Sequence, residues 1–272
     1  MRRELALVVV VLVTGSLPVR GQPAYGLPFK GEEAETFLRT ATVVRKKALG
    51  VGVTHSDQVT LSDGSRTAKA VWKTIDTSRT GTTIFPGGGF VMEFADTYKY
   101  EIAAYELDKL VGLDLVPPTV ERTIKDQTGS LQMWVEGVTT EWERRQENRK
   151  PPNPRLWNEQ MYKVRLLHQL TYNTDYQNIR NVLVDPEFRV YAIDFSRAFA
   201  FYPSLLAEKD LKLFSRTALE GLKRLDRPTL DAKLGRWVEG QRIEAILKRR
   251  DKILALSARL VKEKGEGAVL YY

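Results

Sequence analysis

The sequence contains no cysteine, so disulfide bonds and thiolate metal sites are excluded and stability must come from the buried core. Histidine is nearly absent as well, and we interpret the two that occur, His55 and His168, as structural or surface residues rather than catalytic bases. The sequence also lacks low-complexity tracts and repeats with a period of about 20 to 50 residues, which argues against a solenoid. These absences leave an ordinary globular protein as the expectation.

Long hydrophobic runs are missing too. The apolar run near the N-terminus, Leu5–Val13, has nine residues, roughly half of the ~20 that a helix needs to span a bilayer. Arg2 and Arg3 precede this run and small or polar residues follow it through Gly21, an order that is typical of a secretory signal peptide. We therefore predict cleavage near residue 21 and an extracytoplasmic location, periplasmic or secreted. The alternative is an uncleaved membrane anchor.

The composition is 43% hydrophobic and 28% charged, and 272 residues suit one two-lobed domain or two small ones. The net charge is +8, and removing residues 1–21 takes away three arginines and one glutamate and leaves +6. This balance is compatible with anionic partners such as a nucleotide, phospholipid headgroups or an acidic protein. Lysine and arginine are interspersed with acidic residues instead of forming one basic stripe, so we do not expect nucleic-acid binding.

The segment Tyr172–Phe199 carries two aspartates at the ends of a predicted hairpin. Asp175 opens a polar run that leads into the apolar residues 182–184, and Asp194 closes a second apolar run over 190–193. Carboxylate and amide oxygens gathered at one end of a hairpin are ligands for a hard cation that carries a triphosphate. This is the arrangement of the catalytic and metal-binding loops of a kinase.

In the N-terminal half, the spacing of apolar residues predicts a helix over Glu33–Lys47, which ends in a basic run. Predicted strands follow at 51–54, 58–61 and 68–75, with a hairpin turn at 62–65. Gly50 and Gly52 stand before these strands and could form a loop whose bare N–H groups lie over phosphates. The alternative is a plain turn. We interpret Gly81–Gly89 as a long loop and not as the phosphate cradle.

Lys73 ends the strand 68–75, where a lysine could reach the phosphates of a nucleotide; Lys69, on the same strand, is the rival. A helix is predicted from Tyr100 to Val111, with Glu101 in its first turn. That glutamate is either a partner of the helix dipole or the residue that pairs with Lys73.

Strands are predicted at 115–122 and 129–135, and the following residues 134–137 are either a hinge that meets a base or a plain strand end. Residues 138–158 are dense in charge and proline and should connect two lobes on the surface. Helices are then predicted at 159–171, 211–225, 229–238 and 241–262. The last is basic and could lie on a membrane, but a solvated basic face on a packed helix is the preferred interpretation.

Two stretches together resemble the atypical kinases of the secretory pathway, the four-jointed and Golgi casein kinase group, and more distantly the phosphatidylinositol 3- and 4-kinases. These stretches are the helix and strand over 100–122 and the hairpin over 175–199. The resemblance implies an α+β, two-lobed protein-kinase-like fold with a β-rich N-lobe and an α-helical C-lobe. The expected divisions are a signal peptide 1–21, a tether 22–32, an N-lobe 33–137, a connecting segment 138–158 and a C-lobe 159–272.

The same resemblance implies roles for individual residues. Lys73 would bind the phosphates of ATP with Glu101 as its partner, Asp175 would be the catalytic aspartate, and Asp194 with Asn181 would bind Mg²⁺ or Mn²⁺. The protein would then transfer phosphate from ATP to a hydroxyl acceptor, which could be a protein, a glycan or a lipid.

The sequence departs from the kinase pattern at three places. Tyr176 and Gln177 follow Asp175 where Arg and His are common, and Ser196 replaces the glycine expected after Asp194 and Phe195, which should stiffen that loop. The position of the metal-binding amide holds Arg180, flanked by Asn178 and Asn181. Either a one-residue slip makes Asn181 the ligand or the second metal site is degraded. A pseudokinase and a membrane-surface lipid kinase are therefore the alternatives.

Overall fold

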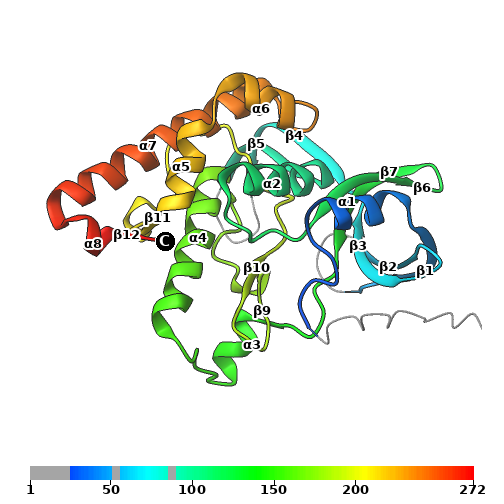
Figure 1. Cartoon of the computed structure of the whole chain (residues 1–272). Coiled ribbons are helices and arrows are strands. Elements are labelled where there is room, and N and C mark those ends of the chain that lie inside the picture. Colours follow the sequence, from blue (N-terminus) through cyan, green and yellow to red (C-terminus); the bar gives the residue numbers. More distant parts are fainter. Residues whose placement is uncertain (1–24, 51–55, 85–89) are drawn as a thin grey trace, which may run out of the picture.

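The computed structural model describes residues 25–50, 56–84 and 90–272 (Figure 1). The predicted signal peptide, 1–21, lies outside the described residues. The N-terminal half contains the elements α1 (Gly31–Thr40), β1 (Thr42–Ala48), β2 (Ser56–Ser62), β3 (Thr67–Lys73), β4 (Asp76–Ile84), β5 (Phe90–Thr97), α2 (Tyr98–Val111), β6 (Thr119–Ile124) and β7 (Gln127–Met133).

The N-terminal sheet has five antiparallel strands in the order β1-β2-β3-β7-β6. The alternation of β3 divides its residues between two faces, because side chains of a strand point to opposite sides in turn. Ala70 and Trp72 are buried in a cluster with Phe37 of α1. Lys69 and Lys73 occupy the alternate positions of the strand and so lie on the opposite face.

The segment before α1 is attached to the sheet. Gly26 exchanges two backbone hydrogen bonds with Glu136, of 2.8 and 2.9 Å. The ring of Phe29 packs on Phe37 with 4.9 Å between centroids. The described part of the expected tether, 25–32, is therefore packed on the domain, and its last residues already belong to α1.

The predicted helix over 33–47 is wrong in its second half. α1 ends at Thr40, Ala41 is extended, and Thr42–Ala48 is strand β1. The β-branched run Thr42, Val43, Val44 favours a strand over a helix. The basic run at 45–47 is consequently part of an edge strand paired with β2 and does not end a helix.

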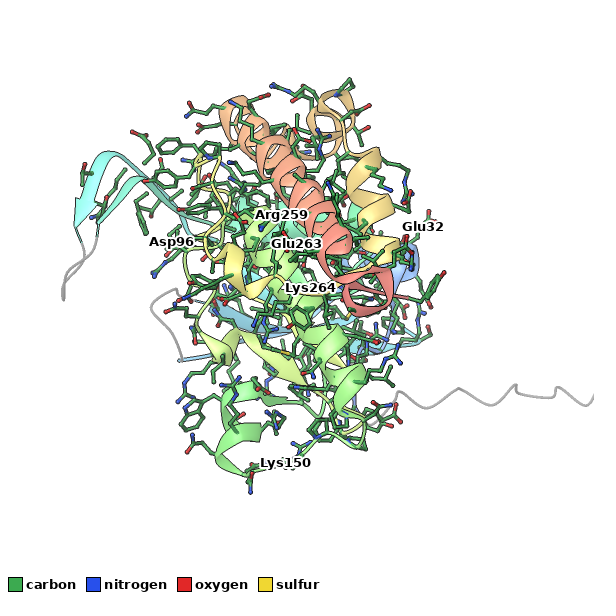
Figure 2. All side chains as sticks on the ribbon, turned by 90° about the vertical axis from the view of Figure 1, so that its left-hand side faces the viewer. Glu32, Asp96, Lys150, Arg259, Glu263 and Lys264 are labelled. Atoms are coloured by element: carbon green, nitrogen blue, oxygen red, sulfur yellow. The ribbon has the colours of Figure 1, made fainter. Side chains whose placement is uncertain are left out.

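Part of the predicted loop Gly81–Gly89 is strand, and residues 85–89 lie outside the described residues. β4 runs to Ile84 and β5 starts at Phe90, and the two strands pair as a hairpin with an irregularity between Arg79 and Thr82. Threonine and apolar residues favour strand structure up to the glycine cluster. Figure 2 shows this hairpin projecting from the body of the protein, with Asp96 near its base.

The C-terminal half is mainly helical, as expected. It contains β8 (Thr139–Thr140), α3 (Glu141–Gln146), α4 (Pro154–Thr171), a 3₁₀ turn η1 (Ile179–Asn181), β9 (Val182–Val184), β10 (Val190–Ala192), a 3₁₀ turn η2 (Glu208–Asp210), β11 (Phe214–Ser215), α5 (Arg216–Arg224), α6 (Arg227–Leu234), α7 (Gly240–Lys264), α8 (Glu266–Val269) and β12 (Leu270–Tyr271).

Capping residues explain where these helices start. Asn153 accepts hydrogen bonds from two N–H groups of the first turn of α4, and Pro154 occupies a position where no N–H is needed, so α4 begins five residues before the predicted start at 159. Ser215 caps α5, which therefore starts at Arg216 and not at 211. The predicted hairpin at 182–193 is present as the antiparallel pair β9 and β10.

The apolar residues form two cores. One lies between α1 and the five-stranded sheet, and the other joins α2, α4, α5, α6 and α7. Ile253, Leu256 and Leu260 of α7 are buried in this second core. Lys252, Lys262 and Lys264 of α7 are exposed, whereas Arg242 and Arg249 are buried, so only some of its basic residues form a solvated face. Within the described part of the chain, no helix combines the length and the apolar character needed to cross a bilayer.

Candidate active site

Lys73 at the end of β3 and Glu101 in the first turn of α2 form an ion pair, as the sequence predicted. Lys73 Nζ lies 2.6 Å from Glu101 Oε1. The exposed fraction of the side chain is 13% for Lys73 and 2% for Glu101. This pair spans the N-terminal sheet and the helix beside it, so β3 and α2 are held in a fixed relation.

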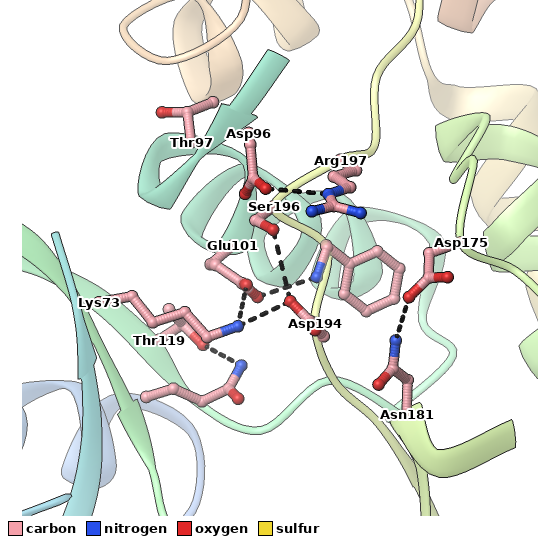
Figure 3. Close-up of polar contacts among 12 residues, drawn as sticks. Lys73, Asp96, Thr97, Glu101, Thr119, Asp175, Asn181, Asp194, Ser196 and Arg197 are labelled. Carbon is pink, nitrogen blue, oxygen red and sulfur yellow. Dashed lines mark hydrogen bonds and ion pairs between the residues drawn. The ribbon is translucent and has the colours of Figure 1, made fainter. Parts of the chain in front are cut away.

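The same ammonium group contacts Asp194, which follows β10. Lys73 Nζ lies 2.8 Å from Asp194 Oδ1 (Figure 3). The backbone N–H of Phe195 donates to Glu101 Oε2 at 3.1 Å, so the helix also holds the chain next to Asp194. Asp194 has a φ of 65°, in the left-handed region that few residues other than glycine adopt. These contacts hold it there.

The three charges shift one another's pKa. Burial would lower the pKa of Lys73, but Glu101 and Asp194 outweigh it and hold that pKa above its usual value. Burial raises the pKa of Glu101 despite Lys73. Burial acts in the same direction on Asp194, yet Lys73 keeps the pKa of this more exposed carboxyl below its usual range. Lys73 is therefore charged at any physiological pH and can hold an anion.

Asp175 lies in the loop after α4 and is held by two amides. Its Oδ2 accepts hydrogen bonds from Asn178 Nδ2 at 3.0 Å and Asn181 Nδ2 at 2.9 Å. Asn173 Oδ1 accepts the backbone N–H of Asp175 at 3.0 Å. The carbonyl of Asn181 accepts the N–H of Ile193 at 2.9 Å, which places Asn181 beside the start of the Asp194 loop. The structure therefore brings Asp175, Asn181 and Asp194 to one end of the β9–β10 hairpin.

Of the residues that depart from the kinase pattern, Arg180 points away from this cluster and Ser196 contacts it. Arg180 is directed at Trp142, with its guanidinium 3.6 Å from the ring centroid, while the next residue, Asn181, faces Asp175. Ser196 lies 3.4 Å from Asp194 Oδ1 through its hydroxyl, and its carbonyl accepts the N–H of Thr97 at 2.9 Å. The position expected for a glycine is therefore tied to the start of α2.

The donor set suits a magnesium-like cation. No group of three or more His, Cys, Asp or Glu side chains that could hold a metal occurs among the described residues. A site that also binds phosphates needs fewer protein ligands, because Mg²⁺ commonly takes one or two carboxylates and completes its shell with phosphate and water oxygens. Asp194 is one-third exposed. Asn181 directs its amide nitrogen to Asp175, which leaves its amide oxygen as an acceptor.

The start of β2 lies beside the lysine. Ser56, the first residue of β2, is the direct partner of Lys73 in the sheet, and Leu49 closes the loop between β1 and β2 by donating to the carbonyl of Ser56 at 3.0 Å. Gly50 has a φ of 61°, and a side chain there would meet nothing within 4 Å. Gly52 lies outside the described residues. The base of the expected phosphate loop thus lies next to Lys73.

Lys69, the rival lysine, has a different partner. It binds Glu136 at 3.0 Å, beyond the end of β7, and its side chain is 43% exposed. The backbone N–H and carbonyl of Glu136 are both bonded to Gly26, so this part of the expected hinge 134–137 is linked to the N-terminal segment. Lys69 therefore belongs to the lobe connection and not to the acidic cluster.

Asp96 and Arg197 form an ion pair near the cluster that the sequence analysis did not predict. Asp96, at the end of β5, is buried and pairs with Arg197 Nε at 2.9 Å, which links the projecting hairpin to the Asp194 loop. The one sequence signal at this place is Thr97, the residue after Asp96, which marks the start of α2 by accepting the N–H of Lys99.

His168 is 4% exposed and stacks on Phe195, with 5.6 Å between the ring centroids, in keeping with a structural role.

No protein-family model and no curated protein sequence matches the chain significantly. Several solved structures, in contrast, match the chain in fold. A structure of the Golgi casein kinase matches with a TM-score of 0.61 and 13% identity, over 90% of this chain and 80% of that chain. The chain has an atypical secretory kinase-like fold.

Two other structures share this kinase-like fold. The structure of hydra Fam20 with sugar has a TM-score of 0.60 and 16% identity, over 87% of this chain and 90% of that one. The proinflammatory kinase CtkA of Helicobacter pylori has a TM-score of 0.51 and 11% identity, over 83% of this chain and 98% of that one. The expected α+β, two-lobed kinase-like fold is thereby confirmed.

Proposed function

We propose that the protein is an ATP-dependent phosphotransferase that acts on a hydroxyl acceptor. The observation that carries this proposal is the contact of one lysine, Lys73, with both Glu101 and Asp194. A lysine held between a helix glutamate and a metal-binding aspartate is the arrangement that protein kinases use to grip nucleotide phosphates. The similarity in fold to the Golgi casein kinase with Mn/ADP bound, with a TM-score of 0.62, supports ATP and Mg²⁺ or Mn²⁺ as the cofactors.

We assign each residue of the cluster a separate task. Lys73 binds phosphate oxygens, Glu101 orients Lys73, and Asp194 and Asn181 supply oxygen ligands to the cation. Once bound, the cation neutralises phosphate charge. Asp175 orients the acceptor hydroxyl and takes its proton. Asn178 and Asn181 both donate to Oδ2 of Asp175, so Oδ1 is the oxygen we assign to proton transfer.

The loop between β1 and β2 would lie over the nucleotide, with Gly50 and Gly52 allowing its backbone to approach the phosphates. We further propose that residues 1–21 are removed on export and that the protein acts outside the cytoplasm.

The pseudokinase alternative rests on Tyr176, Arg180 and Ser196. Arg180 is turned toward Trp142 and Ser196 contacts Asp194 through a hydroxyl, so neither residue removes a proposed ligand from the cluster. We therefore favour catalysis over nucleotide binding without turnover.

The test is consumption of ATP by purified residues 22–272 with Mg²⁺ or Mn²⁺, with and without candidate protein, glycan and lipid acceptors. Turnover that depends on the metal and is lost in Asp175→Asn is the expected result. Metal-dependent nucleotide binding without turnover under every condition would favour the pseudokinase. Absence of nucleotide binding would overturn the proposal.

A further inference from the structure

Helix α5 packs on the backbone of α2 at one glycine. A Cβ atom on Gly221 would lie 2.7 Å from both the carbonyl carbon and the Cα of Val111, and closer still to its carbonyl oxygen. Val111 is the last residue of α2, so the obstacle is helix backbone that cannot rotate out of the way. Any side chain at position 221 would have to push the two helices apart.

The apolar side of α2 belongs to the C-terminal lobe. Its buried residues Tyr100, Ala103, Leu107 and Val111 lie in the core that includes α4, α5 and α7. Among the described residues, the separate core of the five-stranded sheet includes no residue of α2. Figure 1 shows α2 between that sheet and the helices α5 and α6.

Contacts between α2 and the N-terminal helix α1 are polar. Tyr105 and Lys109 both bind Glu35 of α1, at 3.0 and 2.7 Å. The side chains of Tyr105 and Glu35 are largely buried, and α2 also contacts β6 and β7 of the sheet, so the close packing on α5 is one of several contacts that place α2.

The start of α2 is attached to the C-terminal lobe as well. The ring of Tyr100 packs edge-on against Phe199 with 5.3 Å between centroids. Arg242 of α7 donates to the carbonyl of Phe199 at 2.9 Å. Both ends of the helix that carries Glu101 are thus held by residues of the C-terminal lobe.

We propose that Gly221 is a positioning residue for the Lys73–Glu101 pair. By allowing α5 to approach the backbone of α2, it fixes the helix to the C-terminal lobe at the place where Glu101 meets Lys73. That the Lys73–Glu101 pair belongs to a nucleotide site rests on the proposed function. The effect of Gly221 on the position of α2 does not depend on that function.

The first experiment uses no nucleotide, so it is independent of catalysis. The full chain is treated briefly with an amine-acylating reagent, and peptide mass spectrometry gives the acylation rate of Lys73 relative to Lys69 in the same molecule. Gly221→Ala should displace Glu101 from Lys73, which is now only 13% exposed, leave its ammonium group more accessible to the reagent, and so raise this ratio. Gly267→Ala is the matched control, because a Cβ at that position in α8 meets nothing within 4 Å.

A double-mutant cycle separates positioning from general loosening. Glu101→Gln alone should raise the Lys73 ratio, and adding Gly221→Ala should raise it no further. An unchanged ratio in Gly221→Ala, or additive effects in the double variant, would overturn the proposal. Loss of turnover with an unchanged ratio would leave the proposed function intact and reject only the role of Gly221.

A measurement on the unaltered chain covers the case in which Gly221→Ala does not fold. Native-state hydrogen exchange at increasing denaturant identifies which elements open together. The amides of α2 should exchange in the same opening as those of α5 and α6. Exchange of α2 together with β2 and β3 would contradict the proposal.

Discussion

The side-chain amide of Asn181 donates to Asp175 while its backbone carbonyl binds Ile193, one residue before Asp194. One residue thus connects the aspartate assigned to proton transfer with the loop assigned to the cation. The two carboxylates lie at the same end of one hairpin, yet their contacts differ: amides hold Asp175, and an ammonium group holds Asp194.

This difference predicts separate phenotypes for the two aspartates. Asp194→Asn should lose most of the Mg²⁺-dependent affinity for ATP, because it removes a charged ligand. Asp175→Asn should retain that affinity and lose about 10²–10⁴-fold in turnover, the usual contribution of a general base. Calorimetric ATP binding and phosphate transfer, measured on both variants, decide this. Equal loss of binding in both would show a single metal site without a separate base.

Lys73 and Lys69 occupy the same face of β3 but should respond differently to substitution. Lys73→Ala leaves the buried Glu101 without its cation, so it should weaken ATP binding and cost about 3–5 kcal/mol of stability. Lys69→Ala removes an exposed pair worth about 0–1 kcal/mol. Nucleotide titration and urea unfolding compare the two. A greater loss of binding in Lys69→Ala would move the site along the strand.

His168 should make stability depend on pH. Burial lowers the pKa of His168 to about 4, so between that pH and about 6.5 the unfolded chain binds a proton that the folded chain does not. The free energy of unfolding should therefore fall as the pH is lowered through this window, by roughly 3 kcal/mol from this residue. His168→Phe should remove that contribution.

The comparison is made by urea unfolding of both proteins at several pH values. Burial raises the pKa of Asp108 to about 7, which acts in the opposite direction, but this carboxyl is present in both proteins and cancels in the difference. Parallel pH profiles for the two proteins would show that His168 is not held neutral.

Gly129 should tolerate no side chain. A Cβ there would lie 3.0 Å from both Thr74 Cγ2 and Trp72 Nε1, and closer to the carbonyl oxygen of Lys73. Gly129→Ala should push β7 from the end of β3 and destabilise the fold by about 1–3 kcal/mol, with weaker nucleotide binding. Chemical denaturation against Gly267→Ala measures the cost. Equal stability of the two variants would show that the strands can relax.

N-terminal sequencing of exported protein tests the predicted leader. A chain that begins near Gln22 is expected from the order of basic, apolar and small residues. A mature chain that still begins at Met1 and stays in the membrane would reject the extracytoplasmic assignment.

The sequence predicted the parts of the site that depend on local pattern. The β-rich pattern placed Lys73 at the end of a strand, and helical spacing defined the helix that carries Glu101. Their pairing followed from matching these two elements to the kinase arrangement. Asp175 and Asp194 were found because the hairpin between them is short and both of its strands are apolar.

Other features depended on contacts distant in sequence. Whether Arg180 or Asn181 faces Asp175 is decided by a 3₁₀ turn and by the attraction of Arg180 to Trp142, which no local pattern reveals. The ion pair between Asp96 and Arg197 joins residues 101 positions apart. The boundary between α1 and β1 was missed because apolar residues at helical spacing continue into the strand.

Strand β1 has a consequence for association between copies of the protein. It lies at the edge of the five-stranded sheet, and Val44 on it is 58% exposed. An open edge is a template for pairing with another sheet, which leads to aggregation. Arg45, Lys46 and Lys47 follow on the same strand, so edge-to-edge pairing of two copies would bring like charges together. We therefore expect the basic run to oppose pairing of this edge with a second copy.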